Sequence, residues 1–272
     1  REFKIIAELS KNNLMVPKPI FLYTEKEITE DDFYIMEYVE GKTISDNIEA
    51  KLLSSDEKQT ISNSFIETIA DIHNFDVVNS KLNDLGKHEG YVERQLNRWT
   101  KQFEAQKVRE IEDLDFATEM LFQNIPKQQK ISIVHGDYRL GNLIYSLNEP
   151  KVIAVLDWEL STLGHPLADL GYNLMHHVQP TDMYSGLKGL NLEALGIPDI
   201  DVYMRNYCNR TNRDFIDPTF YIVFSLYRNV AILEGVLARG RAGNASSSLA
   251  EERGALGPVF CLLYTYPSPR DS

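Results

Sequence analysis

Cysteine is scarce in this sequence, and the two that occur form no recognisable pattern. Only Cys208 and Cys261 are found among 272 residues. Neither has a second cysteine or a histidine at metal-ligand spacing, and two cysteines do not make a disulfide framework. We therefore expect neither a small secreted scaffold held by disulfides nor a structural metal site built on thiolates.

Long apolar runs are also missing. No run approaches the roughly 20 residues that a helix needs to cross a bilayer, and no secretory signal peptide is recognisable. The chain begins at Arg1 without a methionine, so we expect its true N-terminus to lie upstream. We expect a soluble protein of a reducing compartment, in the cytoplasm or an organelle lumen.

Positive charge is the third thing that is scarce. The chain has 28 Lys and Arg against 40 Asp and Glu, a formal net charge of -12. Non-specific binding to nucleic acid needs a basic surface, so we do not expect it. A cationic substrate would suit this charge, although a solvated acidic surface explains it more simply. The histidines, His165, His176 and His177 included, show no zinc-ligand spacing.

The most informative pattern that is present lies in the stretch ISIVHGDYRLGNLIYSLNEPKVIAVLD. Apolar residues 143–145 and 152–156 flank turn-forming residues, which predicts a β-hairpin. An antiparallel hairpin would place Asn142 roughly opposite Asp157, with Asp137 one short loop before. Two carboxylates and one amide oxygen would then converge, and such oxygen ligands suit the hard cation Mg²⁺.

The order H-G-D-x-x-x-x-N, followed by a strand ending in D-W-E, resembles the catalytic loop and metal-binding strand of the aminoglycoside phosphotransferase and choline kinase superfamily. These enzymes are small-molecule relatives of protein kinases, whose corresponding motifs are H-R-D-x-x-x-x-N and D-F-G. The resemblance implies an α+β, protein-kinase-like two-lobed fold. It also implies transfer of phosphate from ATP, with Mg²⁺, to a hydroxyl of a small molecule.

Residue roles follow from the same resemblance. Asp137 would orient and deprotonate the acceptor hydroxyl, while Asn142 and Asp157 would hold Mg²⁺ on the ATP phosphates. Arg139 would stand where protein kinases carry a lysine near the transferring phosphate, although a surface arginine is an equally good interpretation. Asp169 resembles the aspartate that hydrogen-bonds the catalytic loop from below.

Four further side chains attract attention but are expected to have no direct part in chemistry. His135 precedes the catalytic aspartate, and the resemblance makes it chiefly a scaffold for the loop. His73 ends a predicted helix and is expected to be structural or capping. Trp99 is expected in the core, and Glu159 is expected to face solvent rather than the metal.

The stretch FYIMEYVEG, residues 33–41, predicts a buried strand that breaks at the glycine. It resembles the last strand and hinge of a kinase small lobe. Met36 would then line the adenine pocket, and the backbone of Glu37 and Val39 would grip adenine. By itself the stretch indicates only a buried strand and a turn.

Residues 1–9 predict a helix whose counterpart in kinases carries an acid that pairs with the phosphate-binding lysine. Glu2 would be that acid, although a solvated carboxylate at a helix start fits equally well. The glycine-rich loop and the lysine would have to lie upstream of Arg1. We therefore expect a truncated small lobe.

These patterns divide the chain into a partial small lobe (1–40), a mainly helical large lobe with the catalytic hairpin (41–257) and a tail that looks foreign to the domain (258–272). We predict that the first large-lobe helix, 55–74, has Ser55 as its N-cap and an apolar stripe on one face. The stripe comprises Ile61, Phe65, Ile69 and Ile72. The other predictions are helices over 91–103, 113–124, 167–177, 200–209 and 218–237, a strand over 20–23, and loops over 160–166 and 239–248.

Three stretches refine the resemblance: HGDYRLGNLIY, VLDWELSTLGHPLADLGYNLM and GYVERQLNRW. They look most like the kinase-like domain joined to acyl-CoA dehydrogenases (family members ten and eleven). This implies a hydroxyacyl-CoA or hydroxy acid as acceptor and a fused or associated dehydrogenase module as partner. Two alternatives stay open, an aminoglycoside- or choline-type kinase and a non-catalytic, pseudokinase-like nucleotide-binding module. Without the upstream lysine the chain itself could be inactive.

Overall fold

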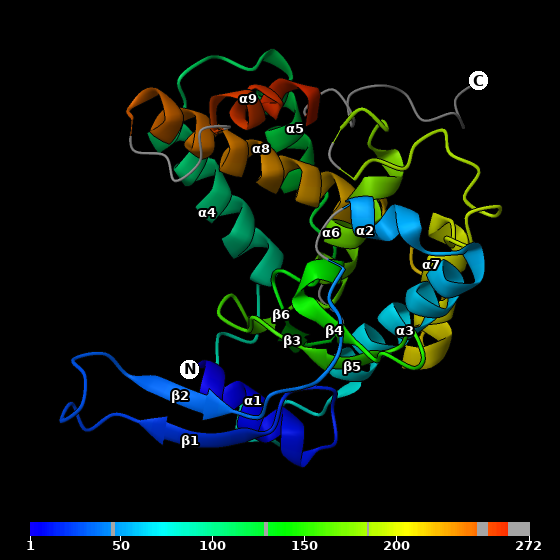
Figure 1. Cartoon of the computed structure of the whole chain (residues 1–272). Coiled ribbons are helices and arrows are strands. Elements are labelled where there is room, and N and C mark those ends of the chain that lie inside the picture. Colours follow the sequence, from blue (N-terminus) through cyan, green and yellow to red (C-terminus); the bar gives the residue numbers. More distant parts are fainter. Residues whose placement is uncertain (45–46, 128–129, 184, 244–249, 261–272) are drawn as a thin grey trace. The chain divides into compact units, whose positions relative to one another are not determined.

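The computed structural model describes two compact units (Figure 1). The described residues are 1–44, 47–127, 130–183, 185–243 and 250–260. The first unit contains residues 1–87, 130–169 and 190–216, and the second contains the described residues of 88–129, 170–189 and from 217 onward. All the predicted site residues lie in the first unit. The units do not divide at residue 40, so the lobe boundary placed there stays a prediction.

Three elements open the first unit. They are α1 (Glu2–Lys11), β1 (Pro19–Tyr23) and β2 (Phe33–Met36), with β1 and β2 paired antiparallel as a ribbon beside α1 (Figure 1). The expectation of a buried strand is wrong, because Ile35 and Met36 are 48% and 39% exposed. Consecutive strand residues point to opposite faces, so both faces of this two-stranded ribbon are partly open to solvent at the end of β2.

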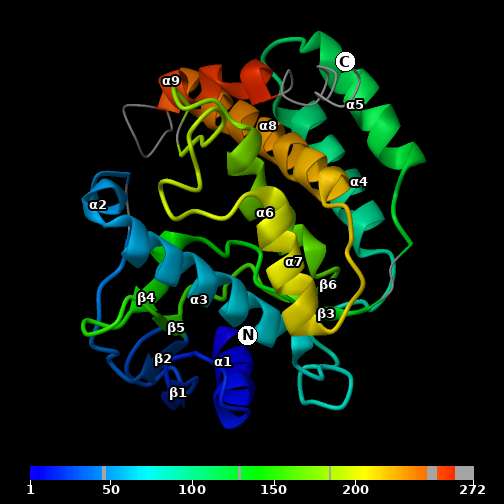
Figure 2. The same cartoon turned by 90° about the vertical axis from the view of Figure 1, so that its right-hand side faces the viewer.

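The long helix α3 (Ser55–Asn74) has the bounds predicted, but its cap is one residue earlier. The Ser54 hydroxyl accepts a hydrogen bond from the Glu57 amide at 3.2 Å, and the Glu57 carboxylate accepts one from the Ser54 amide at 2.9 Å. This reciprocal capping box needs a glutamate three residues after the cap, which Ser55 lacks. The predicted apolar stripe is buried, and α7 (Ile200–Thr211) packs along α3 (Figure 2).

The hairpin predicted around residues 146–151 is present. It comprises the one-turn helix η1 (Leu140–Asn142), β4 (Leu143–Tyr145) and β5 (Val152–Val155), with β3 (Ser132–Val134) before it and β6 (Thr162–Gly164) after it. The expected loop over 160–166 was wrong in part, because β6 pairs antiparallel with β3. Three residues are too few to show a strand period, so only the partner strand reveals β6.

Two backbone ties connect the first 44 residues to this hairpin. Lys42 and Tyr145 exchange both amide hydrogen bonds, at 2.9 and 2.8 Å, and the Val155 amide donates to the Met15 carbonyl at 2.8 Å. Gly41 permits the first tie, because a Cβ there would lie 2.6 Å from the Tyr145 carbonyl oxygen. The segment after the predicted hinge is therefore held directly on β4.

The second unit is a helical bundle. Its elements are α4 (Tyr91–Gln106), α5 (Glu112–Gln123), most of α6 (Leu167–Val178), α8 (Thr219–Arg241) and α9 (Ala250–Ala255). As predicted, α8 is central, and it packs against α4, α5 and α9. Trp99 of α4 is buried there with the Arg228 guanidinium 5.4 Å from its ring centre.

By length and composition α8 could cross a bilayer. This differs from the expectation that no stretch of the sequence is long and apolar enough to do so. Most of its apolar window is buried inside the structure, and the core helix of a globular domain passes the same test. The helix also carries Glu234, which is fully buried. This carboxylate accepts hydrogen bonds from the Val108 amide and Arg109 at 3.0 and 3.1 Å.

Glu234→Ala is expected to lower the free energy of unfolding by about 2–4 kcal/mol, because it removes the carboxylate that accepts from Arg109 Nε and from the part-buried Val108 amide. The measurement is urea unfolding followed by circular dichroism. Glu104→Ala is the matched control, since Glu104 is an exposed partner of Lys107 and such pairs contribute about 0–1 kcal/mol. Equal losses in the two variants would contradict the assignment of Glu234 as a core anchor.

The sequence missed the short helices α2 (Asn47–Leu52) and α9, and the start of the expected loop over 239–248 still belongs to α8. Residues 257–260 are helical and Phe260 is buried, although the tail showed no helical period. Residues 244–249 and 261–272 lie outside the described part of the chain. A foreign origin for the tail stays a prediction.

Candidate active site

The candidate site starts where β3 ends and the chain turns sharply at Gly136. This residue has a φ of +88°, and a Cβ on it would lie 3.0 Å from the Leu160 carbonyl oxygen. Glycine alone accepts both the conformation and the close approach without strain. The turn leads directly to Asp137, so the chain segment that carries the predicted catalytic carboxylate has a fixed course.

Asn142 lies beside Asp137, as the motif predicted. Its side-chain nitrogen donates to the Asp137 backbone carbonyl and to carboxylate oxygen Oδ2, both at 2.9 Å. The turn of η1 brings it there, with the Asn142 amide bonded to the Arg139 carbonyl at 2.9 Å. Because the amide nitrogen is engaged, the amide oxygen is the atom that remains for a cation.

Arg139 also contacts the carboxylate. Its Nε donates to Oδ2 of Asp137 at 3.1 Å, with the two side chains 46% and 24% exposed. The hydrogen bonds from Asn142 and Arg139 both reach Oδ2, so Oδ1 is the oxygen we expect to meet a substrate hydroxyl. An ion pair this exposed contributes about 0–1 kcal/mol to stability. The contact therefore positions the carboxylate and does little for stability.

Asp157 follows β5 and lies one residue beyond the position opposite Asn142. Leu143 pairs with Val155, and the Leu156 amide donates to the Asn142 carbonyl at 2.8 Å. The prediction that Asp157 lies roughly opposite Asn142 therefore holds to within one residue. Asp157 is exposed and has a φ of +65°, a left-handed conformation that aspartate and asparagine tolerate better than most residues.

The donor set of this site fits a magnesium ion. Two carboxylates and an amide oxygen are hard ligands, and Mg²⁺ commonly takes one or two carboxylates and completes its shell with water and phosphate oxygens. Across the described ranges no group of three or more His, Cys, Asp and Glu side chains could hold a metal. Asparagine, which supplies one of the ligands predicted for this site, is not one of those four residue types.

His135 holds the loop in place from inside the unit. It is fully buried, and its Nδ1 accepts from the Asp137 amide at 3.2 Å while its Nε2 donates to the Leu156 carbonyl at 2.9 Å. Burial lowers the pKa of His135, which favours the neutral ring that this pattern needs. With both nitrogens engaged by backbone, the residue is a scaffold, as the sequence predicted.

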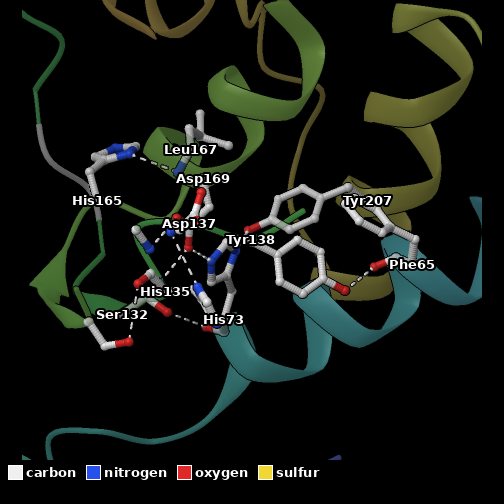
Figure 3. A network of polar contacts seen from close by, with 12 residues as sticks. Phe65, His73, Ser132, His135, Asp137, Tyr138, His165, Leu167, Asp169 and Tyr207 are labelled. Carbon is white, nitrogen blue, oxygen red and sulfur yellow. Dashed lines mark hydrogen bonds and ion pairs between the residues drawn. The ribbon is translucent and has the colours of Figure 1, made fainter. Parts of the chain in front are cut away.

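Asp169, at the start of α6, makes the contact expected of it. Its carboxylate accepts from the His135 amide at 2.7 Å and from the Gly136 amide at 2.9 Å (Figure 3). Burial by itself raises the pKa of Asp169, but the hydrogen bond from His73 and the surrounding donors outweigh it, and the net pKa is lowered. The ionised carboxylate therefore fixes two successive peptide groups next to Asp137.

The predicted nucleotide-binding residues lie in the same unit. Met36 is exposed at the end of β2, and the Glu37 amide donates to the Lys18 carbonyl at 2.9 Å. That bond uses the N–H of Glu37 and keeps its carbonyl for adenine, while Val39 is half-buried. No observation tests the adenine contacts, and they stay a prediction.

Glu2 has a partner that the sequence did not reveal. The Tyr34 hydroxyl donates to its carboxylate at 2.9 Å. Burial, the hydrogen bond to Glu2 and the Glu2 and Asp157 charges raise the pKa of Tyr34 to about 12. The Glu2 carboxylate therefore lies on the side of β2 that carries Tyr34. No local pattern links two residues 32 positions apart, so this pair needed the structure.

Comparison with known proteins identifies relatives over most of the chain. The model of a phosphotransferase enzyme family matches residues 1–194. Acyl-CoA dehydrogenase family member 10 of Mus musculus is 36% identical, over 94% of this chain and 24% of its own length. Family member 11 of Homo sapiens is 34% identical, over 91% of this chain and 32% of its own. The chain thus spans about a quarter to a third of these relatives.

Solved structures agree with the fold. A protein of Ralstonia eutropha, provisionally assigned as an aminoglycoside phosphotransferase, superposes with a TM-score of 0.89 at 38% identity, covering 96% of this chain and 80% of that one. A choline/ethanolamine kinase family protein of Mesorhizobium loti gives 0.62 at 13% identity, over 99% and 80%. An aminoglycoside phosphotransferase in ternary complex with AMP-PNP and hygromycin B gives 0.59 at 14%, over 95% and 81%. The predicted kinase-like α+β fold is confirmed.

Proposed function

The chain belongs to the phosphotransferase enzyme family, and from this premise we propose that it forms the catalytic part of an ATP- and Mg²⁺-dependent kinase for a small-molecule hydroxyl. One observation carries the proposal. Asn142 binds both the backbone and the carboxylate of Asp137, so a metal ligand and a catalytic carboxylate share one rigid turn. A phosphotransferase needs this juxtaposition, because phosphate activation and hydroxyl activation must occur side by side.

Asp137 is the group that receives the proton. Its oxygen Oδ1 accepts a hydrogen bond from the acceptor hydroxyl and takes the proton as the hydroxyl oxygen bonds to the γ-phosphorus of ATP. The bond from that phosphorus to the bridging oxygen breaks, and ADP leaves with the electron pair. Arg139, bound to the other carboxylate oxygen, keeps Asp137 oriented and adds positive charge near the phosphoryl group.

Mg²⁺ would be held by Asn142 and Asp157, and when bound it neutralises charge on the ATP phosphates. The choice of ATP as the phosphate donor is supported by the structurally similar aminoglycoside phosphotransferase that was solved with AMP-PNP bound. Adenine would lie against Met36, with the Glu37 carbonyl and the Val39 amide as its backbone partners. Glu2 would orient the phosphate-binding lysine.

The acceptor class we propose is a hydroxyacyl-CoA or a hydroxy acid. Its support is that the first relatives carry the name acyl-CoA dehydrogenase and that this chain corresponds to only a quarter to a third of them. A kinase module joined to a dehydrogenase would act on related acyl substrates. On this proposal the partner is a fused or associated dehydrogenase module.

An aminoglycoside is the second candidate acceptor, and the structure from Ralstonia eutropha favours it. The net charge of -12 would also attract a polycationic sugar. Charge alone is a weaker argument than relationship, because a solvated acidic surface needs no ligand. The choice between the two acceptor classes is made by experiment.

We expect the complete gene product that contains this chain to consume ATP only in the presence of Mg²⁺ and a hydroxylated acceptor. The test is a screen of hydroxy acids, hydroxyacyl-CoAs, aminoglycosides and choline, with ADP formation and product mass as readouts. EDTA should stop turnover and added Mg²⁺ should restore it.

For each acceptor, the corresponding compound without the hydroxyl serves as the matched control. Phosphorylation of hydroxyacyl compounds alone supports the first proposal, and phosphorylation of aminoglycosides alone supports the second. Tight nucleotide binding without product from any acceptor would contradict both and would favour the non-catalytic module.

A further inference from the structure

A buried polar chain links α7 and α3 to the catalytic loop (Figure 3). The Tyr207 hydroxyl lies 2.9 Å from Nδ1 of His73, and Nε2 of His73 lies 3.3 Å from Oδ2 of Asp169. The same Oδ2 accepts from the His135 amide. His73 is fully buried and all of these residues belong to the first unit. The chain therefore runs without a break from a helix-borne hydroxyl to the peptide next to Asp137.

In this chain of hydrogen bonds, the donor and the acceptor of each bond can be assigned. Burial lowers the pKa of His73, so its ring is neutral, and the ionised Asp169 can only accept. Nε2 of His73 must then carry the hydrogen and donate, which leaves Nδ1 to accept from the Tyr207 hydroxyl. Burial raises the pKa of Tyr207, so that hydroxyl keeps its proton. Every bond in the chain thus has one donor and one acceptor.

We propose that His73, oriented by Tyr207, is a positioning residue that fixes the Asp169 carboxylate and, through it, the catalytic loop. A carboxylate that binds two successive amides must hold one orientation. The amides of His135 and Gly136 lie on different oxygens of Asp169, at 2.7 and 2.9 Å. The hydrogen bond from His73 is the third contact, and it opposes rotation of the carboxylate about its own axis.

Three further hydrogen bonds connect α3 and the loop around Asp137 to their surroundings. The Ser132 hydroxyl donates to the His73 carbonyl at 3.0 Å, and the Ser161 hydroxyl donates to the His135 carbonyl at 3.1 Å. The Tyr138 hydroxyl donates to the Phe65 carbonyl of α3 at 2.8 Å. Because α3 carries both His73 and Phe65, this helix accepts hydrogen bonds from residues before and after Asp137. A buried network of this kind is rigid only when all its members are satisfied.

A set of four variants separates positioning from packing. His73→Leu removes both ring nitrogens at similar volume, and His73→Gln restores one donor and one acceptor. Tyr207→Phe removes a single oxygen. Ile69→Ala is the control, because Ile69 is fully buried one turn earlier on α3 and makes no polar contact.

The first readout is amide hydrogen exchange by NMR, and it does not depend on any activity. His73→Leu should accelerate exchange of the His135 and Gly136 amides about tenfold relative to the β5 amides, the effect of one lost hydrogen bond to a charged group. Tyr207→Phe should give a smaller change of the same kind, and His73→Gln should recover most of the protection. No selective change in the leucine variant, or the same change in Ile69→Ala, would overturn the proposal.

The second readout rests on the proposed kinase function. In the complete gene product, His73→Leu should lower kcat about tenfold with little change in KM for ATP, and His73→Gln should rescue it. A kcat equal to that of the parent protein would overturn the positioning role. If the leucine variant does not fold, Tyr207→Phe decides the question by both readouts. A parent protein without transferase activity contradicts the kinase proposal, and the exchange rates then still test the positioning role.

Discussion

Asp137→Ala is expected to lower phosphoryl transfer by about 10²–10⁴-fold, the usual contribution of a general base. The variant removes the carboxylate that Asn142 and Arg139 both contact. The measurement is kcat with Mg·ATP and the best acceptor from the screen. Nucleotide affinity should change little, because Asp137 acts on the acceptor and not on ATP.

Asp115→Ala is the matched control, since it removes an exposed aspartate from α5 in the second unit. Its kcat should equal that of the parent protein. If Asp137→Ala turned over at the parental rate, Asp137 could not be the proton acceptor. A fall in both kcat and nucleotide affinity would instead place Asp137 in the metal shell.

Loss of metal-dependent nucleotide binding is the expected result of Asp157→Asn. Asparagine suits this test better than alanine, because Asp157 has a φ of +65° and asparagine tolerates that conformation. The substitution keeps the shape and removes the charge that Mg²⁺ needs. Calorimetric titration should show ATP affinity that rises with Mg²⁺ in the parent protein and no longer does so in the variant.

The control is Asp31→Asn, an exposed aspartate in the loop between β1 and β2 of the same unit. It should retain the full Mg²⁺ dependence of ATP binding. Equal ATP affinity with and without Mg²⁺ in the parent protein would count against a metal site at Asn142 and Asp157. It would then favour the non-catalytic module.

The local sequence pattern was sufficient to predict much of the secondary structure of this chain. The amphipathic period of residues 55–74 predicted α3 and its buried stripe, since one apolar face per helix follows from 3.6 residues per turn. Two short apolar runs around a turn predicted the β4–β5 hairpin. The spacing of Asp137 and Asn142 placed both on one turn, because five residues leave the chain little choice of path.

Errors arose where a residue's environment depends on distant partners. Strand β6 exists because β3 lies beside it, and Ile35 and Met36 are exposed because both faces of the two-stranded ribbon are partly open to solvent at the end of β2. Long-range polar contacts were equally invisible in the sequence. Tyr34 meets Glu2 across 32 positions, and His73 meets Asp169 across 96.

The candidate catalytic stretch that ends at Asp157 therefore owes its features to two sources. Its residue types and their spacing, which the sequence alone determined, supply the carboxylates and the amide that we propose to bind a cation and activate a hydroxyl. Its rigidity was decided by tertiary structure, because the groups that fix it come from α3, α6 and α7 and meet only when those elements pack. Periodicity tells which side chains are buried, but only packing decides which buried polar groups find each other.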